Sequence, residues 1–199
     1  CSGAAVADYI YTLVRSGPAE DRYKNLSLVL IPPATQGVSL DLQGTLGLKG
    51  VGTYDVSFDE VRIPASQIIG GEEGWNNGWS KLVGPGLDIE KLEVAAMALG
   101  IATAAVNDAW AYSQERVQFG KPICKIQSIR HMLAEVKTKL EACRLMTYHA
   151  AGLIDQNKNA SVETSMTKLF VCDTARDITI TCQELMGAYG YVKDFDRER

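Results

Sequence analysis

The sequence predicts an α+β fold in which part of an antiparallel β-domain precedes an antiparallel α-helical bundle. Residues 1–70 contain short runs rich in Val, Ile, Leu and Tyr, separated by polar or Gly/Pro segments, as in a sheet of short strands. After Gly70-Gly71 the apolar residues recur at steps of three and four, which is the helical period. These two textures predict a β-domain over 1–70 and a helical bundle domain over 71–199.

Four segments of the first part are expected to form strands. The first two are rich in β-branched, leucine and tyrosine residues, and Pro32-Pro33 ends the second of them. The last two alternate apolar and polar residues, which is typical of a half-buried strand in an antiparallel sheet. The expected strands are 6–14, 26–31, 38–42 and 54–63.

Three long helices are expected in the second part. The first, about 88–115, is rich in alanine, which lets neighbouring helices approach closely. The third begins at Ser161, a predicted N-cap, and continues until Gly187 allows a break. Narrow apolar stripes on these helices favour an antiparallel bundle. The stripe of the second helix consists of Ile126, Ile129, Leu133, Val136, Leu140 and Cys143.

The bulk composition excludes several classes of protein. The chain has 199 residues, of which 46% are hydrophobic and 22% charged, as in an ordinary globular protein with a real core. The formal net charge of −4 argues against nucleic acid as a partner, because no basic run could neutralise phosphates. No segment has the length and apolar composition of a membrane span.

The cysteine pattern predicts reduced thiols and no metal site. The five cysteines are scattered without Cys-x-x-Cys spacing, and only His131 and His149 could join them as metal ligands. Reduced thiols fit a cytosol-like compartment. The cysteines are Cys1, Cys124, Cys143, Cys172 and Cys182.

The segment from Arg116 to Ile123, Arg-Val-Gln-Phe-Gly-Lys-Pro-Ile, followed by Gln127, carries the most chemical information. It places a cation, an amide and an aromatic ring at the end of a long helix. Arg suits a phosphate, Phe suits stacking and Gln suits amide hydrogen bonds, so the group could hold a charged, flat-ringed cofactor. The alternative is a basic helix end that complements the helix dipole and is followed by a turn.

Three separated motifs resemble the carboxy-terminal half of the acyl-CoA dehydrogenase family of flavoproteins. They are the segment just described, Gly86-Leu87-Asp88-Ile89-Glu90-Lys91, and Gln183-Glu184-Leu185-Met186-Gly187-Ala188-Tyr189-Gly190-Tyr191. The resemblance extends over nearly the whole chain, with the motifs in the family's order. It implies a fragment of a longer subunit, without the amino-terminal helical domain, part of the β-domain and the end of the helical domain.

The resemblance implies that Glu90 is the catalytic base. Removing the α-proton of an acyl thioester needs a carboxylate held beside it. In the branch that resembles isovaleryl-CoA and long-chain dehydrogenases, this base lies in a Leu-Asp-x-Glu-Arg segment at a helix start, and Glu90 matches it. In another branch the base lies in a carboxy-terminal tail, and an acidic residue in a first helical turn is also favoured by the dipole alone. The same match implies substrate contacts for Leu87, for Asp88 on the pantetheine arm, and for Lys91, which replaces the usual Arg.

The resemblance also implies an FAD site. Arg116, Gln118, Phe119 and Gln127 match residues that contact the adenosine and pyrophosphate of the FAD of a neighbouring subunit. A second cluster at that end of the cofactor is matched by Gln183 and Gly187. A glycine there lets phosphate approach the backbone, although glycine caps at a helix end would look the same.

The implied function is FAD-dependent α,β-dehydrogenation of an acyl-CoA ester in fatty acid or amino acid catabolism. The implied assembly is a homotetramer that passes electrons to an electron-transferring flavoprotein, in the bacterial cytoplasm or the mitochondrial matrix. Same-fold oxidases and enoyl-CoA reductases are alternatives, as is a non-catalytic helical subunit of a heteromeric relative. We expect the fragment alone to bind FAD poorly.

Overall fold

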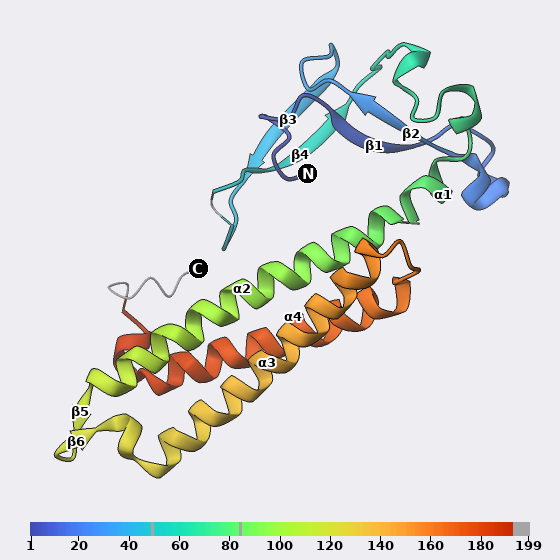
Figure 1. The fold of residues 1–199 in the computed structure, drawn as a ribbon. Helices are drawn as coiled ribbons and strands as arrows, with labels where there is room; N and C mark the ends of the chain where they lie inside the picture. The colour runs from blue at the N-terminus through green and yellow to red at the C-terminus, as the bar shows by residue number, and fades with distance from the viewer. Residues whose placement is uncertain (49, 84, 193–199) are drawn as a thin grey trace. The chain divides into compact units, whose positions relative to one another are not determined.

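The computed structural model describes residues 1–48, 50–83 and 85–192, and the chain divides into two compact units, Cys1–Gly86 and Leu87–Arg199. The first unit contains short antiparallel strands and the second contains long helices (Figure 1). This arrangement confirms the fold class predicted from the sequence.

Two antiparallel strand pairs form the first unit. In the pair β1–β2, Ile10 lies opposite Ile31, and in the pair β3–β4, Val38 lies opposite Phe58. Strand β2 supplies much of the core of this unit, because Leu28 and its neighbours are buried. The strands are β1 Ile10–Arg15, β2 Leu26–Ile31, β3 Val38–Gln43 and β4 Thr53–Phe58.

Two of the expected strands are shorter in the structure. The segment 6–14 becomes extended only at Ile10, after a turn. The segment 54–63 ends as a strand at Phe58. Its end has a local cause, because Glu60 has a φ of 48°, a left-handed conformation that interrupts extended backbone.

The short helix α1, Gly78–Val83, packs against β2 and so belongs to the strand unit. A Cβ atom at Gly78 would lie 2.5 Å from the backbone nitrogen of Leu28, so only glycine allows this approach. Trp79 in α1 also stacks on Tyr23 with ring centroids 4.6 Å apart. The division between the units therefore follows α1, later than the boundary at residue 70 that the sequence suggests.

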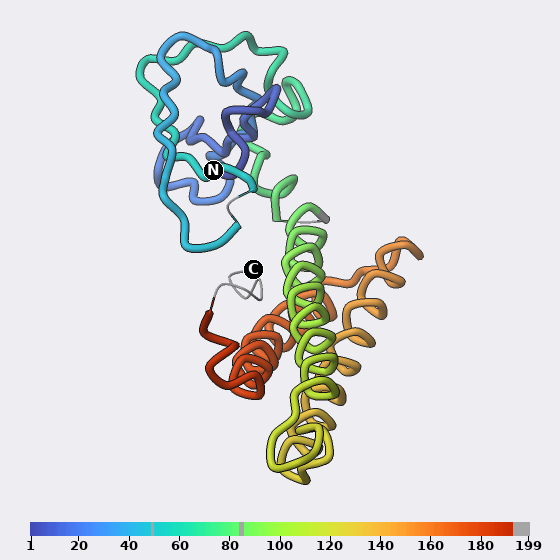
Figure 2. The backbone as a smooth tube through the Cα atoms, turned by 90° about the vertical axis from the view of Figure 1, so that its left-hand side faces the viewer, coloured from blue at the N-terminus to red at the C-terminus, as the bar shows by residue number. Residues whose placement is uncertain are grey.

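Three long helices form the second unit, as the sequence predicts, and consecutive helices run in opposite directions (Figure 1, Figure 2). Alanines of α2, such as Ala95, Ala102 and Ala109, are fully buried and allow close packing against α3 and α4. Larger buried side chains such as Leu140 and Ile178 complete the core. The helices are α2 Pro85–Glu115, α3 Gln127–Asp155 and α4 Ser161–Leu185; a hairpin of β5 Val117–Gln118 and β6 Lys121–Pro122 follows α2.

The predicted role of Ser161 as an N-cap is wrong. Ala160 occupies the cap position of α4, and Ser161 is its first helical residue. The Ser161 hydroxyl donates instead to the Asp88 carboxylate, at 2.9 Å from Oδ1 and 2.8 Å from Oδ2. Because Ser161 already lies inside the helix, its own amide needs an acceptor, and Asn159 Oδ1 provides one at 3.1 Å.

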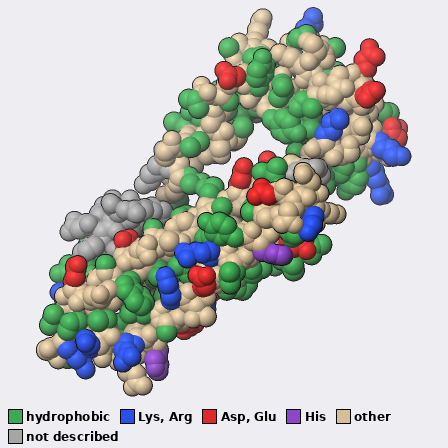
Figure 3. Space-filling model, in the orientation of Figure 1, with side chains coloured by type: hydrophobic (Ala, Val, Ile, Leu, Met, Phe, Trp, Pro, Cys, Tyr) green, Lys and Arg blue, Asp and Glu red, His purple; other side chains and the backbone are tan. Residues whose placement is uncertain are grey.

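Charged side chains of both signs are interspersed with hydrophobic ones over the visible face of the helical unit (Figure 3). Among the described residues, none of the helices combines the length and the apolar character needed to cross a membrane. Within the same residues, no three His, Cys, Asp or Glu side chains gather as metal ligands. Within the described part of the chain none of the five cysteines forms a disulfide, and Cys143 and Cys182 are buried in the helical core.

Candidate functional site

The predicted site residues lie at opposite ends of the helical unit. Leu87, Asp88, Glu90 and Lys91 lie in the first turns of α2, whereas Arg116 follows its last residue. At a rise of 1.5 Å per residue, the two ends of α2 are about 40 Å apart. The predicted base and the predicted cofactor-binding residues therefore belong to two separate places in this chain.

A cavity of about 380 Å³ lies where the end of α2, the β5–β6 hairpin and the end of α4 meet. Arg116, Gln118, Phe119 and Gly187, which are predicted cofactor-binding residues, line it. Residues more than sixty positions apart in the sequence thus form one concave surface. The other lining residues are Tyr112, Ile123, Ile126, Ile129, Glu184, Leu185, Met186, Ala188 and Tyr189.

The hairpin presents Phe119 at its tip. Gln118 pairs with Lys121, so Phe119 and Gly120 are the central residues of a two-residue turn. Both have positive φ, 52° and 77°, as a type I′ turn requires. A bulky residue is strained in this conformation. Packing of the ring does not offset this strain, because Phe119 is 88% exposed. Its ring therefore contributes little to the core of this chain and is available to a ligand or another surface.

One wall of the cavity joins Arg116 to aromatic and charged groups for which the sequence predicts no role. The Arg116 guanidinium lies 5.2 Å from the centre of the Tyr189 ring, a cation–π contact. Tyr112, four residues before Arg116 on the same face of α2, lies 6.0 Å from Tyr189 between ring centroids. Glu184 adds a carboxylate, so the cavity lining contains both a cation and an anion.

Two predicted cofactor-binding residues are not among the lining residues of this cavity. Gln127 is the first residue of α3 and is exposed. Gln183 donates from Nε2 to the Gly190 carbonyl at 3.0 Å and thereby holds the turn after α4. Gly187 within that turn has a φ of 57°, and no atom lies within 4 Å of the position that a Cβ would take. The backbone at Gly187 is therefore open to approach.

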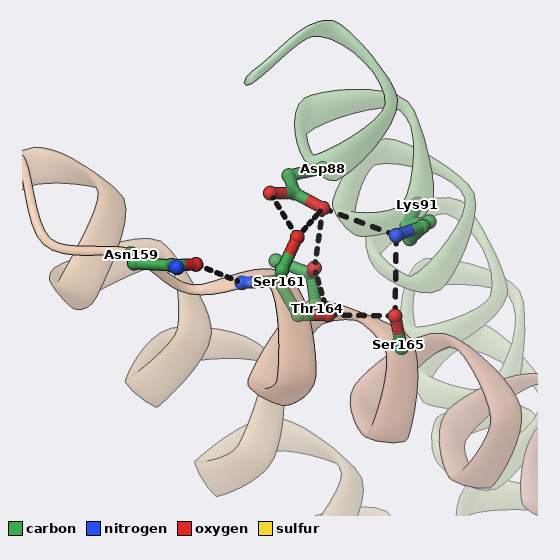
Figure 4. Close-up of polar contacts among 6 residues, drawn as sticks. All are labelled: Asp88, Lys91, Asn159, Ser161, Thr164 and Ser165. Atoms are coloured by element: carbon green, nitrogen blue, oxygen red, sulfur yellow. Dashed lines mark hydrogen bonds and ion pairs between the residues drawn. The ribbon is translucent and has the colours of Figure 1, made fainter. Parts of the chain in front are cut away.

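A polar network joins the start of α2 to the start of α4 (Figure 4). Besides Ser161, the Asp88 carboxylate accepts from Thr164 Oγ1 at 3.3 Å and from Lys91 Nζ at 3.0 Å. Lys91 Nζ also donates to Ser165 Oγ at 3.1 Å. Burial, the largest single influence, raises the pKa of Asp88, but the hydrogen bonds from Ser161 and Lys91, the Lys91 charge and the Thr164 hydrogen bond together outweigh it and lower that pKa.

Glu90 lies on the opposite side of α2 from Asp88, because two residues correspond to about 200° of helical rotation. Its side chain is exposed, and Val94, Met97 and Ile101 follow it along the same face at helical spacing. These three apolar side chains are 45%, 47% and 40% exposed. The opposite face of α2 is also apolar and packs in the core, so α2 is hydrophobic on two sides, as in helices that are covered on both.

Two further cavities lack the combination of groups found at these ends. One of about 670 Å³ in the strand unit is lined by hydrophobic side chains together with Arg62 and Trp75. Another of about 620 Å³ between α2 and α3 is mostly apolar, with Glu93 and Arg144 among its lining residues. Neither is lined by a residue predicted to bind substrate or cofactor, although Ile89 of the motif at the start of α2 lines the second.

The fold and the site together define a helical bundle that follows a β-unit, with a ligand-sized cavity at one end and a carboxylate on an apolar helix face at the other. Residues 76–199 match the family described as acyl-CoA dehydrogenase, C-terminal domain. The chain belongs to the acyl-CoA dehydrogenase family, as its sequence motifs indicate.

Relatives of known function are similar along nearly the whole chain. Cyclohexane-1-carbonyl-CoA dehydrogenase of Geobacter metallireducens is 36% identical over 98% of this chain and 50% of its own length. The caffeyl-CoA reductase–Etf complex subunit CarC of Acetobacterium woodii is 35% identical over 88% of this chain and 46% of its own length. The structure of butyryl-CoA dehydrogenase from Megasphaera elsdenii superposes with a TM-score of 0.91 at 32% identity, covering 99% of this chain and 51% of that one. The chain thus spans about half the length of the curated relatives it matches.

Proposed function

We propose that this chain forms the carboxy-terminal half of an FAD-dependent acyl-CoA dehydrogenase in which Glu90 removes the α-proton of the acyl group. The observation that carries the proposal is the outer face of α2, where a carboxylate is followed by Val94, Met97 and Ile101. An acyl thioester has a matching order of groups, with an acidic C–H beside the carbonyl and hydrocarbon beyond it. Burying that hydrocarbon against α2 would be favourable at about 25 cal/mol per Å².

Residues in the first turns of α2 would have different roles in the reaction. Glu90 accepts the proton, because a base must lie within hydrogen-bonding reach of the proton it removes. The apolar stripe excludes water along the acyl chain. Leu87 and Lys91 flank Glu90 and are the proposed contacts to the rest of the substrate. FAD, when bound, supplies the acceptor for the β-hydride, which no side chain can provide.

The cavity at the other end of α2 fits the adenosine and pyrophosphate half of FAD. Arg116 suits the pyrophosphate, and the open backbone at Gly187 allows a phosphate to approach. Phe119 and Tyr189 offer aromatic faces to adenine, and the Glu184 carboxylate can accept from ribose hydroxyls. Gln118 adds an amide to the same lining.

The separation of the two ends favours an oligomer. About 40 Å along α2 is further than one dinucleotide reaches, so Glu90 and Arg116 of one chain would serve two different FAD molecules. A second copy must then complete each site. We therefore propose a homo-oligomer, a tetramer by resemblance.

The relatives support two directions for the same chemistry. One is named a dehydrogenase, whereas the Acetobacterium woodii protein is named a reductase and belongs to a complex with Etf. We infer that this protein exchanges electrons with an electron-transferring flavoprotein. The bacterial cytoplasm or the mitochondrial matrix is the proposed compartment.

The test is an anaerobic absorbance titration of the full-length protein with a panel of acyl-CoA esters. We expect an oxidised flavin band that one class of ester bleaches. Glu90→Gln should abolish the bleaching while leaving FAD bound. Glu93→Gln is the matched control, because Glu93 lies one turn further along α2 and lines the α2–α3 cavity instead.

Each other outcome has a defined meaning. The reductase direction would be favoured if no saturated ester bleaches the flavin band, but an enoyl-CoA restores the band after the flavin has been reduced. If the ester still fully bleaches the flavin of Glu90→Gln, the base is another residue, as in the branch of the family whose base lies in a carboxy-terminal tail. A full-length protein without flavin would favour a non-catalytic helical subunit.

A further inference from the structure

Helix α4 begins without a capping side chain of its own. Its cap position is Ala160, which has no side-chain acceptor for the amides of the first turn. Asn159 Oδ1 accepts the Ser161 amide at 3.1 Å, just outside the helix. Glu163 lies in the first turn of α4, and a second carboxylate reaches this turn from another helix, since Ser161 and Thr164 both donate to Asp88.

Asp88 therefore serves two helix starts at once. It lies in the first turn of α2 and against the first turn of α4, so one carboxylate complements the positive ends of both helix dipoles. Lys91, three residues further on, partly balances its charge and extends the contact to Ser165. The Asp88 side chain is only 14% exposed and Thr164 is fully buried, so these contacts lie largely away from water.

We propose that Asp88 is a positioning residue that joins the starts of α2 and α4 and thereby fixes the turn that carries Glu90. The inference rests on the proposed function, in which Glu90 is the base. Asp88 and Lys91 hold this turn from the side facing α4 (Figure 4). Glu90 comes two residues after Asp88, about 200° further around the helix, and so lies on the other side. These bonds add to the helical hydrogen bonds of the turn in fixing its direction.

This role differs from a substrate contact. The Asp88 Oδ1 atom already accepts from Ser161, Thr164 and Lys91, and Oδ2 accepts from Ser161. If Asp88 acted by binding substrate, the hydroxyl of Ser161 on α4 would matter little to the reaction. If Asp88 acts by positioning, losing the Ser161 hydroxyl should slow proton removal although Ser161 itself carries no reacting group.

The experiment compares Ser161→Ala, Ser161→Thr and Asp88→Asn in the full-length flavoprotein, with the acyl-CoA ester that bleaches the wild type. The rate of anaerobic flavin reduction is measured at saturating ester, and the ester concentration for half-maximal rate is measured separately. We expect Ser161→Ala to lower the saturated rate about tenfold, because small misplacements of a reacting group are costly. The half-saturating concentration should change less than about twofold, and Ser161→Thr should restore the rate.

Two controls separate positioning from loss of structure. Thr181→Ala, in the last turns of α4, removes a hydroxyl that bonds only the carbonyl of Asp177 in its own helix and should keep the wild-type rate. Flavin content and helix signal of every variant should match the wild type. The double variant Ser161→Ala/Asp88→Asn should be no slower than the slower single variant, because both substitutions disrupt the same hydrogen-bonded contact.

A wild-type rate in Ser161→Ala would overturn the positioning role while leaving the proposed function intact. Asp88 would be assigned to substrate binding instead if Asp88→Asn changed only the ester concentration for half-maximal rate, and if this effect were additive with that of Ser161→Ala. A wild-type flavin that no ester bleaches would overturn the proposed function, and the positioning role with it.

Discussion

The two ends of the helical unit are built in opposite ways. At the start of α2, charged and hydroxyl groups are bonded to one another, and the Asp88 carboxylate accepts from Ser161, Thr164 and Lys91. At the end of α2, Arg116 and Phe119 line an open cavity, and the Phe119 ring is almost fully exposed. Both ends carry residues of recognisable sequence motifs.

Under the proposed function, the difference separates residues that hold the fold from residues that contact a ligand. Polar groups bonded internally stabilise the chain that contains them. A concave surface with a few convergent polar and aromatic groups is instead typical of a binding site. Changes at the Asp88 end should therefore affect stability, and changes at the cavity should affect FAD affinity.

Asp88→Ala should have the largest effect on stability. It removes the acceptor of several charge-assisted hydrogen bonds and leaves Thr164 buried without the carboxylate, so we expect a loss of about 2–3 kcal/mol. Urea unfolding of the full-length protein, followed by its helix signal, measures this loss. Asp173→Ala, an exposed position of α4, should change stability by less than about 0.5 kcal/mol. Equal effects of the two changes would contradict the comparison.

The difference in stability between the wild type and Asp88→Ala should depend on pH. The folded-state pKa of Asp88 lies below its ordinary value, so its stabilising contribution is present above a pH of about 4 and is lost as the pH falls through the folded pKa. The stability gap between the wild type and Asp88→Ala should be constant near neutral pH and narrow below a pH of about 4. A gap that widened on acidification would refute the assignment.

Arg116→Ala should have the largest effect on cofactor binding. We expect FAD affinity to fall about thirtyfold, since Arg is the proposed partner of the pyrophosphate. The FAD affinity of Arg116→Lys should lie between those of the wild type and Arg116→Ala, because Lys keeps the charge without the planar guanidinium. Titration of the full-length apoprotein with FAD gives both constants. An unchanged affinity in Arg116→Ala would remove the cavity from the FAD site.

Phe119→Asn should change stability and binding in opposite directions. Asn-Gly is the preferred pair for the type I′ turn that Phe119 and Gly120 form, so the apoprotein should gain about 0.5–1 kcal/mol of stability. FAD affinity should fall about threefold to tenfold, because the aromatic face is lost. Phe119→Tyr keeps the aromatic face and should retain affinity. A loss of stability in Phe119→Asn would show that the ring packs rather than binds.

Local patterns in the sequence predicted much of this arrangement. The strand Leu26–Ile31 and the helix Ser161–Leu185 were anticipated because each has a regular apolar period and clear flanking residues. Arg116, Gln118 and Phe119 stand together in one segment, and Gly187 lies in a glycine pattern, so local sequence is enough to select them. The structure brings all four to one cavity, and their contacts with FAD stay a prediction.

Contacts between distant residues explain what the sequence missed. The local context of Ser161 predicts an N-cap, but the helix begins one residue earlier and the Ser161 hydroxyl donates to Asp88, which lies 73 positions away in the sequence. Tyr112 and Glu184 belong to the cavity only because the ends of α2 and α4 meet. The sequence also gives no sign that the Gln183 amide donates to the Gly190 carbonyl, and the contact of Gln183 with FAD stays a prediction.

Gly187→Ala should give the smallest effect and the finest comparison within the cavity. A Cβ at Gly187 would meet no atom within 4 Å, so only its φ of 57° opposes the change, at about 1 kcal/mol. At Gly190 a Cβ would meet the Gln183 carbonyl, so Gly190→Ala should cost clearly more stability, by the same urea measurement. If a phosphate approaches Gly187, its alanine variant should also lose FAD affinity beyond the small loss of stability. Equal FAD affinity in Gly187→Ala and the wild type would limit the phosphate contact to Arg116, and would make Gly187 a residue of the turn alone.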